Sequence, residues 1–309
     1  MVQLDIKRLT TTDDMSEIHE LLGAVERADG VRPLSDHLWI DLRQGGRPGF
    51  AGLLAWQSGH HHAVAYCQVS RGNESWSLDL IVHPHHRYEM ATIGPQLLTE
   101  AVRIVAEEGG GHVHWWVFEP TETHVSLARA IDFQPGRNML QMRVTLPLAP
   151  TILESVPAIA TRTFQVGADD QEWLEVNNRA FLDHPEQGGW TPELLHARQH
   201  EPWFDPSGLL LHHVDHRLAA FCWTKVHVDT DPMLGEIYVV AVDPNDAGAG
   251  LGRALTVAGL SHLVQVGAQI GMLFVDAENT RAISMYNALG FTIHHVQRAF
   301  VGDIRPLNR

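Results

Sequence analysis

A glycine-rich turn between an apolar run and a helix is the strongest chemical signal in this sequence. The apolar residues 237–242 lead into Asp243-Pro244, and the turn Ala247-Gly248-Ala249-Gly250-Leu251-Gly252-Arg253 follows. A turn of this kind at the start of a helix points several backbone N–H groups, and the positive end of the helix dipole, at one spot. Residues 247–253 are therefore predicted to bind an anion such as a pyrophosphate.

Two polar side chains further along the chain share a helix face with each other. Asn279 and Tyr286 are seven residues apart, which is two helical turns. The glycine turn, the strand before it and this helix together resemble the acyl-CoA site of the GCN5-related N-acetyltransferase (GNAT) superfamily. The resemblance implies an α/β fold and the transfer of an acetyl group from acetyl-CoA to an amine.

The resemblance also implies catalytic roles for Glu236 and Tyr286. Glu236 stands at the start of the strand, where the superfamily commonly keeps a catalytic carboxylate. An ionised carboxylate can draw a proton from an ammonium group through water. Tyr286 matches the tyrosine that faces the CoA sulfur, and its protonated phenol can supply the proton that a departing thiolate takes up. We expect these two residues to act as general base and general acid.

Acetyl-CoA is expected to lie along three segments of the second half. Gly250 and Gly252 match the glycines of the superfamily's pyrophosphate loop, whereas Gly248 and Ala249 stand where relatives often carry arginines. The preceding strand is expected to bond the pantetheine arm through its backbone, and Asn279 to contact the cofactor. The predicted cofactor-binding residues of this half are Val240, Ala241, Val242, Ala247, Gly248, Ala249, Gly250, Leu251, Gly252, Arg253, Asn279, Thr280, Arg281, Ala282, Ile283 and Ser284.

The chain repeats its own pattern at a long interval. The run ending at Pro84 echoes the run ending at Pro244, and Phe133 falls 158 residues before Phe291. Helical and strand-like runs follow the same order in both halves. This order predicts two tandem GNAT domains of α/β class, each a mixed central sheet flanked by helices. The predicted parts are an N-terminal GNAT-like domain at 1–148, a proline-marked linker at 149–158 and a catalytic domain at 159–309.

The first half lacks the predicted catalytic pair. The repeat places Trp76 where the second half has Glu236, and Ala128 where it has Tyr286. The phosphate loop of the first half retains one glycine of the pattern. We therefore expect chemistry in the second half alone. The acyl-CoA contacts expected in the first half are Leu80, Ile81, Val82 and Gly94.

The acceptor side of the second half carries an unusual string, His184-Pro185-Glu186-Gln187-Gly188-Gly189-Trp190. Its proline and glycines predict a shaped loop between two helices, and its carboxylate, amide and ring suit a polyhydroxylated amine. With residues 221–227 and 235–240, this string resembles the mycothiol synthase family, tandem GNAT enzymes of actinobacteria. The resemblance implies that the acceptor is the cysteinyl amine of cysteinyl-glucosaminyl-inositol. The implied acceptor contacts are Asp36, Glu186, Lys225, Glu236 and Phe274.

The composition narrows the range of partners. The chain has 309 residues and a net charge of −15, which argues against a nucleic-acid or anionic-membrane surface. Its 21 histidines lie in separate segments without the spacing of a motif such as HExxH, so we expect no metal. Cys67 and Cys222 lie in apolar runs and are expected to be buried free thiols in a reducing cytosol. We predict a cytoplasmic monomer.

Two other functions remain open from the sequence. A GNAT enzyme for another amine, such as an aminoglycoside or a peptide N-terminus, would share the same donor site. A non-catalytic acyl-CoA sensor would fit the degenerate first half, although Glu236 and Tyr286 speak against it. A Tyr286→Phe variant separates the enzyme from the sensor, because only the enzyme would lose turnover while it still binds CoA.

Overall fold

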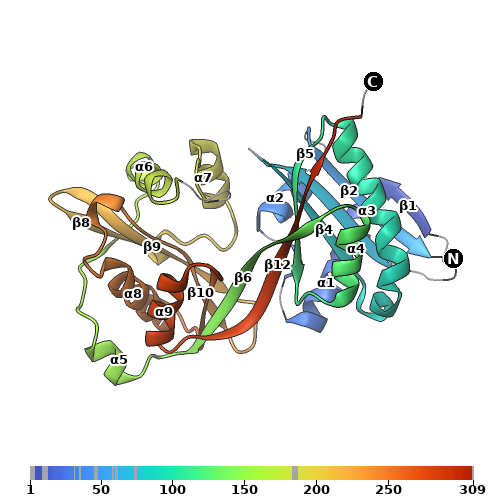
Figure 1. Ribbon diagram of the computed structural model, residues 1–309. Coiled ribbons are helices and arrows are strands. Elements are labelled where there is room, and N and C mark those ends of the chain that lie inside the picture. Colours follow the sequence, from blue (N-terminus) through green and yellow to red (C-terminus); the bar gives the residue numbers. More distant parts are fainter. Residues whose placement is uncertain are drawn as a thin grey trace. The chain divides into compact units, whose positions relative to one another are not determined.

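The computed structural model describes residues 4–8, 13–30, 32–34, 36–44, 48–57, 59, 62–72, 75–182 and 187–307. They form two compact units (Figure 1). The first unit comprises Met1–Asn138 and Val296–Arg309, and the second comprises Met139–His295. Strands β6 (Gln134–Thr145) and β12 (Thr292–Ile304) each begin in one unit and end in the other. This division differs from the predicted one at 148–159, because the two long strands belong partly to each unit.

The first unit is an α/β domain with a mixed sheet. The strand pairs β1–β2, β2–β3, β3–β4 and β5–β12 are antiparallel, and β4–β5 is parallel. Its helices are α1 (Asp13–Asp29), α2 (Asp36–Gln44), α3 (Met90–Glu107) and α4 (Glu122–Ala130), with a 3-10 turn η1 (Pro84–Glu89). Its strands, besides the start of β6 and the end of β12, are β1 (Leu4–Arg8), β2 (Phe50–Gln57), β3 (Ala65–Arg71), β4 (Trp76–Val82) and β5 (Gly111–Phe118).

Alternation along the strands of the first unit creates two core layers. Leu53 and Cys67 join the cluster under α3 and α4, whereas their chain neighbours Leu54 and Tyr66 join the cluster under α1 and α2. Successive side chains of a strand point to opposite faces, so a sheet covered by helices on both sides has apolar residues in both registers. The expectation of a central sheet flanked by helices is confirmed for this unit.

The second unit repeats this design. Its sheet has the strand order β6-β11-β10-β9-β8-β7, in which β10 and β11 are parallel and the other neighbours are antiparallel. The strands besides β6 are β7 (Arg162–Thr163), β8 (Leu209–Val214), β9 (Arg217–His227), β10 (Leu234–Val242) and β11 (Ile270–Asp276). The helices are α5 (Pro150–Glu154), α6 (Asp170–Ala180), α7 (Pro192–Gln199), α8 (Leu251–Gln265) and α9 (Thr280–Ala288), with 3-10 turns η2 (Pro206–Gly208) and η3 (Pro244–Asp246).

Helices cover both faces of the second sheet (Figure 1). Helices α6 and α7 pack on one face through an aromatic cluster that includes Trp173, Trp190 and Trp223. Helix α8 packs on the other face, where Gly259 lies so close to β9 that an added Cβ would be 2.6 Å from the sulfur of Cys222. Both cysteines are buried free thiols, as predicted. Among the described residues, none of the helices combines the length and apolarity needed to cross a membrane.

Candidate active site

Strands β10 and β11 are neighbours that separate part of the way along. Their parallel pairing runs from Leu234–Ile270 to Glu236–Met272. Within residues 187–307, which the structure describes without a gap, β10 has no ladder partner in β11 beyond Glu236. Strand β10 keeps its pairing with β9 as far as Val242, and β11 keeps its pairing with β6 as far as Asp276. The resulting fork leaves one edge of 237–242 open to hydrogen bonding by an extended ligand.

A β-bulge follows Glu236 on the opposite edge of β10. The register with β9 shifts between Ile237 and Val239, so Tyr238 is the extra residue. A bulge of this kind bends a strand and re-aims its side chains. Ile237 faces α8, since its Cδ1 would be 2.9 Å from a Cβ at Gly259, whereas Val239 belongs to the core under α6 and α7. The bulge thus turns β10 away from the straight course of β11.

Glu236 is buried at the mouth of this fork and is bonded to a histidine. Its Oε2 lies 2.8 Å from Nε2 of His227, and the two side chains are 9% and 15% exposed. Strand register explains the contact, because Glu236 lies opposite Lys225 and His227 is the next residue of β9 on the same face. His227 was not among the predicted site residues. Its only sequence signal is the two-residue spacing from Lys225, which gains meaning once the register is known.

Lys225 packs against aromatic rings on the same face of the sheet. Its side chain is buried, and its Nζ lies 4.6 Å from the ring centroid of Trp203 and 5.6 Å from that of Tyr238. Both rings also contact Trp223. A cation over aromatic faces is stabilised by their quadrupoles, and more so where water is excluded. Lys225 and Glu236 are directly opposite each other in the strand register, so their side chains lie on the same face of the sheet.

The glycine-rich turn is fixed at its start by a buried aspartate. Asp243 is fully buried and accepts bonds from the N–H of Asn245 at 3.0 Å and from the guanidinium of Arg179 at 2.7 Å. Burial alone would raise the pKa of this carboxyl, but the bond from Asn245 and the charges of Arg179 and Arg217 outweigh burial and lower it. Asp243 therefore remains an anion that ties the turn to α6.

Beyond Asp243 the turn is exposed and uses positive φ angles. Gly248 has φ 94° and Gly250 has φ 78°, a region that side chains other than glycine rarely adopt. Gly250 is the N-cap residue of α8, so the first N–H groups of the helix, at Leu251, Gly252 and Arg253, have no intrahelical partner. These donors and the helix dipole make the turn suited to an anion.

The two predicted residues Asn279 and Tyr286 lie near opposite ends of helix α9, as its N-cap and in its last turn. Asn279 caps the helix, because its Oδ1 accepts the N–H of Ala282 at 3.1 Å, and residues 279–281 are exposed. Tyr286 is buried against Phe291, with ring centroids 5.7 Å apart. Burial raises the pKa of the Tyr286 phenol well above its usual value, and the nearby Cys222 adds to the shift. The phenol is therefore protonated at neutral pH.

The remaining acceptor residues are described to different extents. Phe274 is 38% exposed on β11 and stands opposite Gln141 of β6. It shares a face with Met272, the partner of Glu236, so it borders the fork on the same side as Glu236. Asp36 begins α2 in the first unit, but its side chain lies outside what the structure describes. Glu186 lies outside the described residues altogether.

The first unit has a fork of its own. Strands β4 and β5 pair from Trp76–Val113 to Leu78–Trp115, and within the continuous range 75–182 that pairing does not continue to the predicted residues 80–82. Gly94 lies inside α3, where an added Cβ would be 2.7 Å from Leu127 of α4. This glycine therefore allows two helices to pack closely, and acyl-CoA binding at residues 80–82 and 94 stays a prediction.

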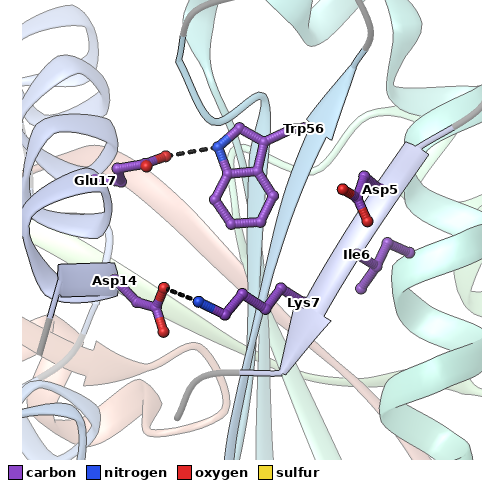
Figure 2. Close-up of a pocket in the computed structure, with 6 residues that line it drawn as sticks. All are labelled: Asp5, Ile6, Lys7, Asp14, Glu17 and Trp56. Atoms are coloured by element: carbon purple, nitrogen blue, oxygen red, sulfur yellow. Dashed lines mark hydrogen bonds and ion pairs between the residues drawn. The ribbon is translucent and has the colours of Figure 1, made fainter. Parts of the chain in front are cut away.

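A hollow on the first unit is a different place (Figure 2). It measures about 550 Å³ and is lined by residues of β1, α1 and β2. Two interactions join residues of its lining: Nζ of Lys7 lies 2.6 Å from Asp14, and the indole N–H of Trp56 donates to Glu17 at 2.6 Å. The predicted catalytic residues lie in the other unit, so we assign this hollow no part in the chemistry.

Known proteins resemble both the second unit and the whole chain. The FR47-like protein family matches residues 219–301, which include β10, the glycine turn and α9. A tandem GNAT protein from the clavulanic acid biosynthesis pathway has a TM-score of 0.73 at 17% identity, over 99% of this chain and 100% of its own. A GCN5-related N-acetyltransferase from Sphaerobacter thermophilus has a TM-score of 0.68 at 22% identity, over 98% of this chain and 96% of its own.

Sequence relatives are closer. The mycothiol acetyltransferase of Thermobispora bispora is 41% identical over 94% of this chain and 96% of its own length. That of Thermomonospora curvata is 41% identical over 93% of each chain. The predicted tandem GNAT fold is confirmed, and with identity at this level along nearly its full length, the chain belongs to the mycothiol acetyltransferase family of GCN5-related N-acetyltransferases.

Proposed function

We propose that this protein transfers the acetyl group of acetyl-CoA to the cysteinyl amine of cysteinyl-glucosaminyl-inositol, the step that yields mycothiol, and that the second unit performs it. The observation that carries the proposal is the fork between β10 and β11, with the buried Glu236 at its mouth and a glycine turn at its far end. The family membership supports the choice of acceptor.

Acetyl-CoA fits the fork in an extended conformation. The open backbone edge of 237–242 offers alternating N–H and C=O groups to the amide bonds of the pantetheine arm. The N–H groups of the turn and of the first residues of α8 would receive the pyrophosphate. This orientation directs the thioester toward Glu236. Residues 279–284, at the exposed start of α9, would contact the same cofactor.

Glu236 and Tyr286 divide the proton transfers between them. The amine must lose a proton before it attacks the thioester carbonyl, and the Glu236 carboxylate would accept that proton through water. His227 fixes the orientation of the carboxylate through its 2.8 Å bond. When the C–S bond breaks, the departing thiolate requires a proton, and the buried Tyr286 phenol is held in the form that can donate one.

The acceptor would enter from the face that carries Lys225 and Phe274. The buried ammonium of Lys225 can donate charge-assisted hydrogen bonds to sugar or inositol hydroxyls. Phe274 offers an exposed ring against the apolar side of a sugar. Contacts from Glu186 and Asp36 complete the proposal as predictions from the resemblance.

Mass spectrometry of the reaction tests the proposal. We expect an acetyl-sized mass gain on the amine of cysteinyl-glucosaminyl-inositol. Glu236→Gln and Tyr286→Phe should each reduce kcat by about 10²- to 10⁴-fold, the usual range for a lost general base or acid. Acetyl-CoA binding, followed by calorimetry, should change little in either variant.

Other results would redirect the assignment. Acetyl-CoA binding without any gain on this acceptor would sink the mycothiol assignment and direct the search to other amines. Full turnover in Tyr286→Phe would remove the phenol from the mechanism. Binding of acetyl-CoA with no acetyl transfer to any amine would favour the sensor over the enzyme.

A further inference from the structure

The side chains of His62, His83 and His86 lie close together in the first unit, although His62 is more than twenty residues before the other two. His62 lies before β3, His83 directly follows β4, and His86 lies in η1. One ring nitrogen of each lies within 4.8 Å of those of the other two. The closest pair joins Nε2 of His62 to Nε2 of His86 at 3.3 Å. Two imidazole nitrogens at that distance share a hydrogen bond or a cation.

The backbone positions of the three rings follow from strand pairing. Strands β3 and β4 are antiparallel with Ala65 opposite Val82, which brings the start of one strand beside the end of the other. The ladder continues past the strands, because His83 N–H donates to the carbonyl of Val64 at 2.9 Å. His86 N–H donates to the carbonyl of His83 at 2.8 Å, and the His86 ring is 2% exposed. The rings therefore stand on ordered backbone.

A carboxylate supports the buried ring from behind. Oε2 of Glu89 lies 3.1 Å from Nδ1 of His86, on the ring edge opposite the nitrogen that faces His62. An acceptor at Nδ1 places the proton of a neutral imidazole there and leaves the lone pair on Nε2. Carboxylate–histidine pairs with this geometry are the usual support of histidines that bind metals.

We propose that His62, His83 and His86 bind a divalent transition-metal ion of the Zn²⁺ type, independently of the acetyl-transfer site. Zn–N bonds of about 2.0–2.1 Å in a tetrahedral site separate the ligand nitrogens by about 3.4 Å. The His62–His86 pair already has that spacing, and the third nitrogen has to approach by no more than about 1.4 Å. Three neutral imidazoles suit Zn²⁺, Cu²⁺ or Ni²⁺, with water as fourth ligand.

Ligation has to displace one weak bond. Nδ1 of His83 accepts the backbone N–H of His85 at 3.2 Å. If His83 binds the ion through Nδ1, that lone pair is used, and if it binds through Nε2, the proton moves to Nδ1. The bond is lost in either case and is replaced by a metal–nitrogen bond. The nearest strong positive charge, Arg87, is paired with Asp29 through two bonds of 2.6 and 2.7 Å, which reduces its repulsion of an ion.

The test uses the full-length protein, stripped with a chelator and titrated with Zn²⁺ alone in competition with a chromophoric chelator. We expect one tight equivalent per chain. His62→Ala and His83→Ala should each weaken that site by at least about tenfold, and Glu89→Gln should weaken it by about 10- to 100-fold without changing the stoichiometry. Circular dichroism shows whether each variant is folded. Co²⁺ in place of Zn²⁺ should give the visible absorption of a tetrahedral site.

A matched control addresses the other histidines of the chain. His196 of α7 and His200, the C-cap residue of that helix, have ring centroids 4.1 Å apart, a spacing that can also hold an ion. The double variant His196→Ala/His200→Ala should keep the tight equivalent. The proposal is overturned if no Zn²⁺ binds, if folded His62→Ala and His83→Ala bind it unchanged, or if the tight equivalent disappears with the control pair instead.

Discussion

The proposed base of the second unit, Glu236, is bonded to a residue of the neighbouring strand β9. Glu236 is buried, and its carboxylate is in hydrogen-bond contact with His227 at 2.8 Å. A general base must lie within hydrogen-bond reach of the proton it removes, so the loss of orientation costs rate even when the base itself remains. His227 therefore acts in our proposal as a positioning residue that does not contact the reacting atoms.

We expect His227→Gln to lower kcat by about tenfold, the effect of one hydrogen bond to a charged group. The KM for acetyl-CoA should stay within about twofold, because the glycine turn is untouched. Steady-state kinetics with both substrates measures the two effects. His212→Gln on β8 is the control and should behave like the unmodified protein. A large rise in the KM for acetyl-CoA, with kcat unchanged, would contradict the positioning role.

The residues that the sequence could predict are those with a local signature. The glycine turn after an apolar strand, and the Asn279–Tyr286 spacing on a helix, can be recognised without knowledge of the fold. His227 could not be predicted, because its role depends on which residue of β10 lies across from it. The metal-binding cluster was missed for the same reason, since antiparallel pairing of β3 with β4 brings His62 to His83.

At the scale of elements, the glycine-rich turn is held in place by Asp243, the residue before it, and by Arg179 of α6. Asp243 is fully buried between the end of β10 and the guanidinium of Arg179 on α6. Its carboxylate also bonds the N–H of Asn245, so it fixes both the strand end and the first residues of the turn. The exposed glycines Gly248 and Gly250 have positive φ angles, and the turn that they form starts from this hydrogen-bonded strand end.

Asp243→Asn should lower the free energy of unfolding by about 2 kcal/mol, the range for a hydrogen-bonded charge that is lost. The pKa of Asp243 is lower in the folded protein than in the unfolded chain, so its charge stabilises the fold above about pH 4 and less as pH falls through the folded value. Urea unfolding at several pH values should therefore show a shallower acid-side loss of stability in the variant. An identical slope would contradict this role.

Gly250→Ala tests the turn itself. Open space surrounds this position in the structure, so the added Cβ meets backbone strain alone, at about 1 kcal/mol for a positive φ. Gly167 has a similar φ of 80° in open space and lies outside the predicted site, so Gly167→Ala should carry the same strain. Both variants should lose similar stability, but only Gly250→Ala should raise the KM for acetyl-CoA. Equal KM values in the two variants would contradict a role for the turn in binding.

The order of elements could be predicted from glycines, prolines and apolar runs, and the predicted strand 235–242 and helix 279–288 agree with β10 and α9 within a residue or so. The binding of the pantetheine arm by the backbone of β10 was expected only through the resemblance, and the fork between β10 and β11 was not predicted from the residues. Residues 237–242 carry no local pattern that predicts which backbone edge of β10 lacks a partner strand. That edge is determined by where the pairing with β11 ends, at Glu236 and Met272, which are far apart in the sequence.

At the scale of the whole molecule, the boundary between the two sequence repeats differs from the boundaries between the two structural units. The end of β12 completes the first unit, with Phe300 fully buried and its ring centroid 5.6 Å from that of Trp115. The end of β6 pairs with β11 in the second unit. A repeat in the sequence shows that two similar halves exist. It does not show that β12 pairs with β5 or that β6 pairs with β11, because such long-range pairing has no local sequence pattern.

We therefore expect residues 1–148, expressed alone, to lack a cooperative unfolding transition, because β5 loses one of its two partner strands and the core loses Phe300. A chimaera in which a short flexible linker joins Asn138 to Val296 should fold, since Arg298 Nε lies 2.9 Å from Asn138 Oδ1. Thermal unfolding followed by circular dichroism compares the two. A cooperative transition of 1–148 at the temperature of the chimaera would contradict the expectation.

The pairing of β12 with β5 also affects the order in which the two units can complete their folding during synthesis on the ribosome. Strand β5 is synthesised before residues 139–295 of the second unit, but its partner, residues 297–304, is synthesised after them. One edge of β5 therefore stays unpaired in the first unit while the whole second unit is translated. The first unit can complete its sheet only after the second unit has been synthesised.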